Sequence, residues 1–353
     1  MLTIGVDAHK GTHVAVAVDA AGQECGHWQG PNSIEGWVAL RTWAKERGTE
    51  RRWGIEGAWN YGRGLAQSLV AAGELVHEVN ARWTAKERRH ARNRSKTDRR
   101  DAQAIALYVW REGQTLPLVV RDDDSAVLEV LVSQRDAAVA EATRLRNQAH
   151  QLLLQGDPSY REHVPALTTE QGIAALETYQ APEASVLAQT RAAMIRMLGQ
   201  RLRLAVAQAE ELKTQIEARA RAGFSPLIQL KGINALTAGT LAAILGPGHR
   251  FRSDADLALY AGVAPLEVSS AGRVRHRLNR GGHRQLNAIV HRIALTQLRA
   301  WPDAKADVAR RMSEGKTKRE AIRALKRYLI RAIWRLWQEC VPPPQSTPIA
   351  AVA

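Results

Sequence analysis

The chain has 353 residues, 45% of them hydrophobic, which is enough for two or three domains with buried cores and excludes a wholly disordered chain. No apolar run reaches the ~20 residues of a membrane span, and no signal-peptide core follows the N-terminus. Two cysteines, Cys25 and Cys340, cannot build a disulfide framework or a Cys-rich zinc site, so we expect a soluble protein of a reducing cytoplasm. Fifty Lys and Arg against 35 Asp and Glu give a net charge of +15, which favours a polyanionic partner such as nucleic acid.

Residues 1–80 alternate strand and helix signals, as in a mixed α/β sheet domain. Leu2–Asp7 and His13–Asp19 are β-rich, and the short turn between them predicts an antiparallel hairpin because a parallel crossover needs a dozen or more residues. The further predicted elements are a helix capped by Ser33, a strand over Arg52–Glu56, a helix over Leu65–Ala72, a strand over Leu75–Val79 and a helix over 95–112 capped by Ser95 or Thr97.

Residues 125–222 change character. Small and aliphatic residues recur at alternating steps of three and four from Leu128 to Leu152 and again from Ile195 to Ile216. This spacing predicts two heptad-like helices that form an α-helical hairpin, whose seam lies either within one chain or between subunits. Residues 223–340 are predicted to be mostly helical, and Lys231-Gly232-Ile233-Asn234 resembles the turn of a helix-hairpin-helix that can hold a phosphate. Residues 341–353 are predicted to be a flexible tail.

Positive charge is segregated into three blocks. Residues 82–101 hold nine Lys and Arg against three acids, residues 268–302 hold no acid, and residues 310–335 hold ten basic residues against two acids. Such blocks are typical of contacts with backbone phosphates, although a stripe of this kind also solvates a long helix. The candidate nucleic-acid-binding residues are Arg88, Arg89, Arg92, Arg94, Lys96, Lys231, Arg273, Arg275, Arg277, Arg280 and Arg284.

Four acids form a candidate metal site. Asp7 and Glu56 each end a predicted strand, where α/β sites commonly form, and Asp98 and Asp101 lie three apart on one face of a predicted helix. Four such carboxylates could hold two Mg²⁺ or Mn²⁺ ions and stabilise the attacking and leaving oxygens of a phosphodiester. Taken singly, each acid could equally be a turn residue, a strand end or an ion-pair partner of Arg99 or Arg100.

These residues resemble a known family. Asp7 in IGVDAHK, Glu56 in GIEG, and Asp98 with Asp101 in KTDRRDA are similar to the DEDD motif of the IS110 class of insertion-sequence transposases, relatives of the Piv-type DNA invertases. The segments LIQLKGINALTAGTLAAILG and FRSDADLALYAGVAPLEVSS resemble the second domain of that family. The resemblance covers nearly the whole chain and implies a RuvC-like (RNase H-like) fold for the N-terminal domain.

The same resemblance implies a serine nucleophile in a segment of the form P-x-x-x-x-S-G. Counting from Pro265 selects Ser270, and Ser269 is the second choice because Ala271 stands where the family has glycine. The neighbouring arginines could neutralise a phosphoryl group and help to stabilise a serine alkoxide. The family further implies that double-stranded donor and target DNA are recognised through a structured bridge RNA, and that the active centre is assembled between subunits of a dimer or tetramer.

The expected fold class is therefore α/β plus α: a RuvC-like domain over 1–124, a helical coiled-coil hairpin over 125–222, a mostly α-helical transposase domain over 223–340 and a tail over 341–353. The expected activity is RNA-guided DNA strand exchange in the bacterial cytoplasm, at the nucleoid, with Mg²⁺ or Mn²⁺ and no membrane. Two alternatives stay open. One is a RuvC-like Holliday-junction nuclease that hydrolyses DNA with the carboxylates alone, and the other is a non-catalytic nucleic-acid scaffold.

Overall fold

The structure is a computed structural model that describes residues 1–80, 84, 97–246, 250–267, 276–279 and 281–340, with the backbone alone described at 266, 267 and 276–278. The expected tail over 341–353 lies outside these residues. The described chain falls into two compact units. The first comprises described residues of Met1–Ser125, Pro226–Ile233 and Ile244–Ala353, and the second comprises Ala126–Ser225 and Asn234–Ala243.

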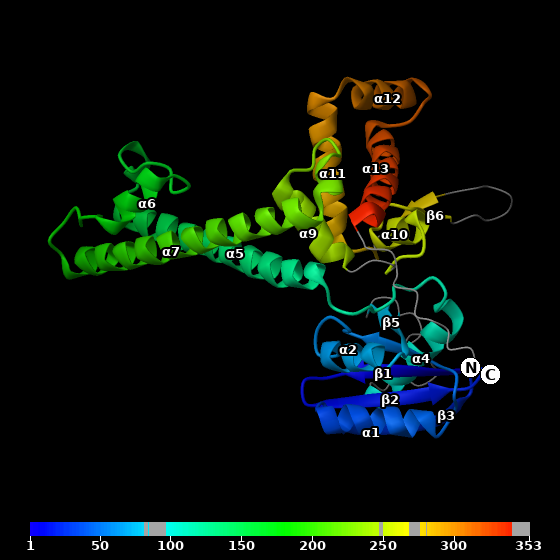
Figure 1. The fold of residues 1–353 in the computed structure, drawn as a ribbon. Helices are drawn as coiled ribbons and strands as arrows, with labels where there is room; N and C mark the ends of the chain where they lie inside the picture. The colour runs from blue at the N-terminus through cyan, green and yellow to red at the C-terminus, as the bar shows by residue number, and fades with distance from the viewer. Residues whose placement is uncertain (81–83, 85–96, 247–249, 268–275, 280, 341–353) are drawn as a thin grey trace. The chain divides into compact units, whose positions relative to one another are not determined.

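Five strands form one mixed sheet in the order β3-β2-β1-β4-β5 (Figure 1). They are β1 (Leu2–Ala8), β2 (Thr12–Val18), β3 (Glu24–Pro31), β4 (Arg51–Glu56) and β5 (Leu75–Val79). The first three strands pair antiparallel, whereas β4 pairs parallel with both β1 and β5. The expected hairpin and both later strands are confirmed, and the mixed sheet with helices on its faces forms an α/β domain, as predicted.

Strand β3 was not predicted. It carries Gly26, Gly30 and Pro31, which weaken a strand signal because glycine and proline are depleted in strands. It nevertheless pairs along the whole of β2 as the outer strand of the sheet, and its residues alternate between half-buried and exposed. At the edge of a sheet a strand needs only one partner, so tertiary pairing overrides the weak local propensity.

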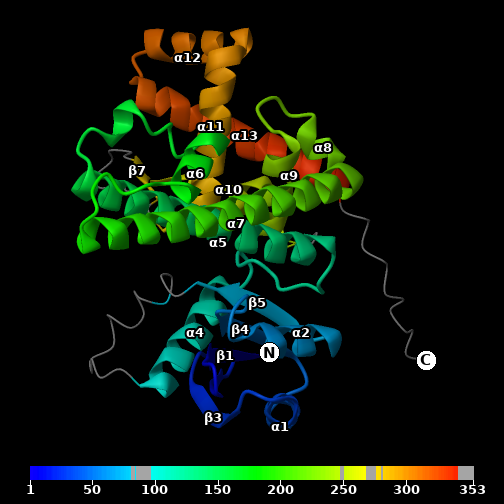
Figure 2. The same cartoon turned by 90° about the vertical axis from the view of Figure 1, so that its left-hand side faces the viewer.

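Helices cover both faces of the sheet, as Figure 2 shows. Helices α1 (Ile34–Lys45) and α2 (Arg63–Ala71) share a buried cluster with Ile4, Trp53 and Ile55, which face one side. Helix α4 (Asp98–Glu112) packs on the other side against Val14, Val16 and Val18. The Ser33 and Thr97 side chains accept hydrogen bonds from the backbone N–H groups of Gly36 and Arg100, so both predicted N-caps are confirmed.

Helix α4 lies directly on β1 because Gly5 has no side chain. A Cβ atom built on Gly5 would be 2.2 Å from the Ala106 N atom and 2.3 Å from the Ala102 O atom. The neighbouring Gly54 of β4 is similarly close, since its Cβ would be 2.3 Å from Val109 Cγ2. Contacts this short are possible only for glycine, so the pair fixes the height of α4 above the sheet.

The second unit is built on two long helices, α5 (Asp124–Gly156) and α7 (Val186–Gly223), joined through the short helices η1 (Tyr160–Glu162) and α6 (Glu170–Glu177). Residues of the predicted heptad seam are buried between the long helices, among them Leu145, Ala149, Ile195 and Leu202. The hairpin is therefore confirmed, and this part of the seam lies within one chain.

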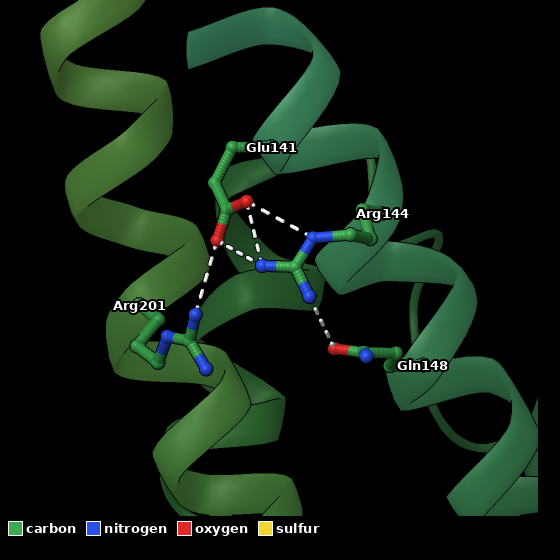
Figure 3. Close-up of polar contacts among 4 residues, drawn as sticks. All are labelled: Glu141, Arg144, Gln148 and Arg201. Carbon is green, nitrogen blue, oxygen red and sulfur yellow. Dashed lines mark hydrogen bonds and ion pairs between the residues drawn. The ribbon is translucent and has the colours of Figure 1, made fainter. Parts of the chain in front are cut away.

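A polar cluster beside the seam includes one contact between the two long helices (Figure 3). The Arg144 Nη2 atom donates to Glu141 Oε1 at 2.5 Å, and Arg201 Nη2 on α7 donates to the same oxygen at 3.1 Å. Arg144 also donates to Gln148 Oε1 at 3.4 Å. Because these groups are partly exposed, they define alignment more than they add stability.

The described residues after the hairpin are mostly helical, as predicted. Helices α8 (Ser225–Ile228) and α9 (Ala235–Leu245) flank the predicted helix-hairpin-helix turn, in which Gly232 has a φ of +92° and Asn234 Oδ1 accepts the Thr237 N–H. The remaining elements are α10 (Asp254–Tyr260), β6 (Pro265–Glu267), β7 (His276–Leu278), α11 (Arg284–Ala300), α12 (Pro302–Ser313) and α13 (Lys318–Cys340). No helix among the described residues is long and apolar enough to span a membrane.

Within the first unit, a buried arginine ties the C-terminal helices to the sheet domain. Arg250 forms an ion pair with Glu78 of β5 and donates to the Ile244 carbonyl at 2.7 Å and the Tyr260 hydroxyl at 3.2 Å. The Arg250 carbonyl in turn accepts the Leu118 N–H at 3.1 Å. An unpaired charge would be costly at this depth, so the Glu78 carboxylate and these hydrogen bonds are needed together.

The close approach of α4 predicts that Gly5→Ala lowers the free energy of unfolding by about 1–3 kcal/mol or more, because the backbone of α4 cannot yield as a flexible side chain would. Gly48→Ala is the matched control, since a Cβ there would meet only Leu2 Cβ at an ordinary 3.7 Å. Urea unfolding of both variants measures the difference. Equal stabilities for the two variants would contradict the proposed packing constraint.

Candidate functional site

Asp7 and Glu56 lie side by side at the ends of two parallel strands. In the register of β1 and β4 these two residues are direct Cα partners, so they occupy neighbouring positions about 4.8 Å apart. Side chains alternate along a strand, which places Asp7 on the same face as Gly5, the face that α4 covers. Only 8% of the Asp7 surface is exposed.

The first turn of α4 brings two more acids to this end of the sheet. Asp98 and Asp101 follow the Thr97 cap, where carboxylates are also favoured by the helix dipole. Asp101 is buried, at 6% exposure, whereas the Asp98 side chain is 56% exposed. Arg99 between them pairs with Glu24 of β3 at 2.5 Å. The three-residue spacing therefore places the two acids on one face of α4, while Arg99 points toward β3.

The four predicted acids influence one another. The pKa of Asp7 is raised, first by burial and then by the negative charges of Asp101, Glu56 and Asp98, while His9 acts to lower it. Burial penalises the charged form of a carboxyl group, and nearby carboxylates penalise it further. Asp101, Glu56 and Asp98 therefore lie close enough to Asp7 to disfavour its charged form, and a bound cation would relieve that repulsion.

The donor set fits a divalent cation. Asp7, His9 and Asp98 each offer one ligand atom, and these atoms lie within 4.8 Å of one another. Carboxylate oxygens suit Mg²⁺ or Mn²⁺, and two ligands on an ion of that size are separated by about 3–4 Å. Glu56 accepts a hydrogen bond from the buried Thr84 hydroxyl at 3.2 Å, which orients its carboxylate. Asp7 and Asp98 would therefore hold such an ion, with Glu56 and Asp101 beside them.

His9 is the residue at this site that was not predicted, because it was assigned to the hairpin turn. Its Nε2 atom lies 3.2 Å from Asp7 Oδ2 and 3.7 Å from Asp98 Oδ1. His9 lies just after β1, in the turn to β2, so strand spacing gives no reliable signal for it. It is identified only by the structure, which places Asp98 of α4 beside it.

The predicted nucleophile segment lies outside the described residues. Strands β6 and β7 pair antiparallel, with Glu267 opposite His276, and residues 268–275 connect them. Ser269, Ser270, Arg273 and Arg275 belong to that connection, as Arg280 belongs to a further gap, and the side chain of Arg277 is also not described. The roles of these residues therefore stay predictions.

The predicted phosphate contacts of the first basic block also stay predictions, because these residues lie outside the described part of the chain: Arg88, Arg89, Arg92, Arg94 and Lys96. Of the other predicted phosphate contacts, Arg284 is exposed at the start of α11. The exposed Lys231 has its ammonium group 3.1 Å from the centre of the Trp301 ring, a cation–π contact that orients it.

The third basic block is partly structural. Arg310 and Arg311 pair with Asp307, and Arg327 and Arg331 both pair with Asp254. Asp254 and Asp307 precede the block in the sequence, so a count of charges within it overlooked them. Lys326 is buried and donates to Asn287 Oδ1 at 2.6 Å. Many basic side chains of this block therefore form contacts within the protein and stabilise its helices. The block thus agrees better with a role on the helices themselves than with contacts to backbone phosphates.

Comparison with known proteins gives consistent matches along the chain. Residues 4–158 match the model of DEDD-type IS110 transposases, described as "Transposase", and residues 225–309 match the model described as "Transposase IS116/IS110/IS902 family". The first match contains all four acids of the candidate site, and the second contains Ser269 and Ser270.

Two curated relatives extend these matches. The 43.6-kDa protein of insertion element IS110 from Streptomyces coelicolor is 28% identical over 69% of this chain and 71% of its own length. The 42-kDa protein of insertion element IS900 from Mycobacterium paratuberculosis is 25% identical over 98% of both chains. Among solved structures, T. thermophilus RuvC in complex with a Holliday junction substrate is similar to 34% of this chain and 99% of its own, with 16% identity and a TM-score of 0.27.

The raised pKa of Asp7 predicts a pH-dependent difference between the wild type and Asp7→Asn in metal-free buffer. Folding favours the neutral carboxyl, so the contribution of Asp7 to stability is present below its ordinary value of 3.8 and is lost as pH rises through the raised value. Asparagine mimics the neutral form. As pH rises from 4 to 7, Asp7→Asn should therefore gain stability relative to the wild type.

Asp254→Asn is the control of opposite sign. Hydrogen bonds from Arg327 and Arg331 lower the pKa of Asp254, so its stabilising contribution is present above its ordinary pKa and is lost on acidification. Urea unfolding in EDTA across this range should show the wild type gaining on Asp254→Asn as pH rises. A pH-independent difference between Asp7→Asn and the wild type would contradict the crowding of carboxylates at Asp7.

Proposed function

The chain belongs to the IS110 class of DEDD transposases, which are enzymes encoded by insertion sequences, and from this premise we propose that it exchanges DNA strands through one centre that joins the four carboxylates to a serine. The observation that carries the proposal is the burial of Asp7 among Glu56, Asp98 and Asp101. A protein that binds polyanionic DNA gains nothing from four clustered acids unless a cation binds between substrate and protein.

Asp7 and Asp98 would hold Mg²⁺ or Mn²⁺, with Glu56 and Asp101 completing the set. Such an ion, when bound, neutralises charge on the scissile phosphate and stabilises the entering and leaving oxygens. The protein's own part is to hold the carboxylates in place. Gly5 sets the height of α4 above β1, Thr97 caps that helix, and Thr84 orients Glu56.

Ser270 is the proposed nucleophile. Its Oγ atom forms a bond to phosphorus while one ester P–O bond of the DNA breaks, and the departing oxygen takes up a proton to become a hydroxyl. The resulting phosphoserine keeps the energy of the phosphodiester. In the second step the hydroxyl of another strand attacks the phosphoserine, which releases Ser270 and rejoins the DNA. Arg273 and Arg275, close in sequence, would neutralise the phosphoryl group.

We propose double-stranded donor and target DNA and a structured guide RNA as the partners. The resemblance to the IS110 class supports the RNA, and the net charge of +15 and the first two basic blocks provide for more than one duplex contact. Lys231 and Arg284 are the described members of the phosphate-binding set, and both are exposed.

We also propose that the chain acts as a homo-oligomer, a dimer or tetramer in which a second copy covers part of the helical hairpin. Among the exposed large apolar residues of α7, four lie beside the buried seam: Leu187, Met194, Met197 and Leu204. Their spacing of seven, three and seven places them along one stripe of the helix. An exposed stripe of this size on a helix that already has one partner indicates a second helical partner.

The serine is tested by following the covalent intermediate. With cognate donor DNA, target DNA, guide RNA and Mg²⁺, Ser270→Ala should lose the protein–DNA adduct seen on a denaturing gel while keeping its affinity for nucleic acid. Ser269→Ala is the matched control and should keep the adduct. Omission of the RNA should abolish the reaction of the wild type.

Each other outcome rejects a defined part of the proposal. An adduct that persists in Ser270→Ala and vanishes in Ser269→Ala would move the nucleophile by one residue. Cleaved ends that carry no protein would favour metal-dependent hydrolysis by a junction nuclease. Full binding without reaction in Mg²⁺ or Mn²⁺ would favour a non-catalytic scaffold.

A further inference from the structure

Among the described residues at the acidic cluster, His9 has no task in either the motif or the proposed mechanism. It follows β1 directly, in the turn to β2, and its imidazole lies between acids from two different elements. Its Nε2 atom is 3.2 Å from Asp7 Oδ2 on β1 and 3.7 Å from Asp98 Oδ1 on α4. A hydrogen bond between His9 and Asp7 explains the 3.2 Å distance, but it does not explain why the same Nε2 atom also lies 3.7 Å from Asp98 Oδ1.

The turn that carries His9 is held in place. The His9 N–H donates to the Thr12 carbonyl at 3.0 Å, and the Asn32 N–H donates to the Gly11 carbonyl at 3.0 Å. The Asn32 side chain reaches back to the Lys10 carbonyl at 3.2 Å, and its own oxygen accepts from Trp37 Nε1 at 2.9 Å. The backbone at His9 is thus fixed from several sides, so the imidazole is presented to the acids at low entropic cost.

We infer that His9 is a nitrogen ligand of the cation, which makes the site an oxygen–nitrogen–oxygen set of Asp7, His9 and Asp98. The inference rests on the proposed function, in which Asp7 and Asp98 hold a divalent ion. Ligand atoms about 2.1 Å from one ion are about 3 Å apart when adjacent and about 4.2 Å apart when opposite. The two distances from His9 Nε2 and the 4.8 Å limit on all three atoms agree with a shared ion after small adjustments.

A nitrogen ligand changes the choice of metal. Carboxylates alone suit Mg²⁺ and Mn²⁺ alike, whereas imidazole suits transition metals better than it suits Mg²⁺. A site that includes His9 should therefore bind Mn²⁺ with a larger preference over Mg²⁺ than a site built from Asp7, Glu56, Asp98 and Asp101 alone. Replacing His9 by a residue that lacks the imidazole should reduce that preference rather than weaken both ions equally.

Pulsed electron paramagnetic resonance of bound Mn²⁺ tests the ligand directly. The full-length protein is stripped with EDTA, loaded with one equivalent of Mn²⁺ and examined for coupling of the electron spin to a directly bound ¹⁴N nucleus. The wild type should show this coupling, and His9→Gln should lose it. His9→Gln should also bind Mn²⁺ at least about tenfold more weakly in a titration, with a smaller change for Mg²⁺.

Two control variants make the outcomes separable. His27→Gln replaces an exposed histidine of β3 and should keep the nitrogen coupling. Asp7→Asn should lose the bound Mn²⁺, which establishes that the ion sits at the proposed site. Mn²⁺ that depends on Asp7 yet shows no nitrogen coupling in the wild type would overturn the role of His9 and leave the proposed function standing. Mn²⁺ that binds equally to Asp7→Asn would contradict the metal site of the proposed function itself.

Discussion

The close packing of helix α4 on strand β1 is the constraint on which the candidate site depends. Gly5 allows the backbone of α4 near Ala102 and Ala106 to lie where any Cβ atom would collide with it. The helix begins one turn earlier, so Asp98 and Asp101 reach the end of β1 at Asp7, and strand register adds Glu56. The absence of a side chain at Gly5 therefore lets α4 pack close to β1. This brings Asp98 and Asp101 to Asp7, although both lie more than ninety residues from it in the sequence.

The second constraint is the electrostatic repulsion among the clustered carboxylates, which disfavours the close packing that brings them together. Packing that buries Asp7 and Asp101 beside two further acids raises the pKa of Asp7 and costs stability near neutral pH. The clustered acids therefore repel one another in the metal-free protein, and a bound divalent ion would relieve this repulsion. Shifted pKa values of this kind are typical of functional sites. The whole chain nevertheless carries a net charge of +15, which favours the approach of phosphates that the acids alone would oppose.

Much of the sheet domain could be predicted because its signals are local. Ser33 and Thr97 cap the helices assigned to them, and the short turn before Thr12 forces a hairpin. Features that depend on distant partners could not be predicted in this way. Strand β3 exists through its pairing with β2, the Arg250–Glu78 pair joins residues 172 apart, and Asp254 neutralises arginines of α13. The acids were predicted by motif, whereas His9 became visible only when α4 placed Asp98 beside it.

The proposed function requires Asp7, Glu56, Asp98 and Asp101 to surround a divalent ion. A crystal structure of the protein with Mn²⁺, recorded at a wavelength where manganese scatters anomalously, would reveal such an ion. We expect an anomalous peak about 2.1–2.3 Å from carboxylate oxygens of Asp7 and Asp98, with Glu56 and Asp101 in contact with the same ion, its water ligands or a second ion. A well-ordered structure in saturating Mn²⁺ with no peak among these four acids, or with their side chains turned apart, would contradict it.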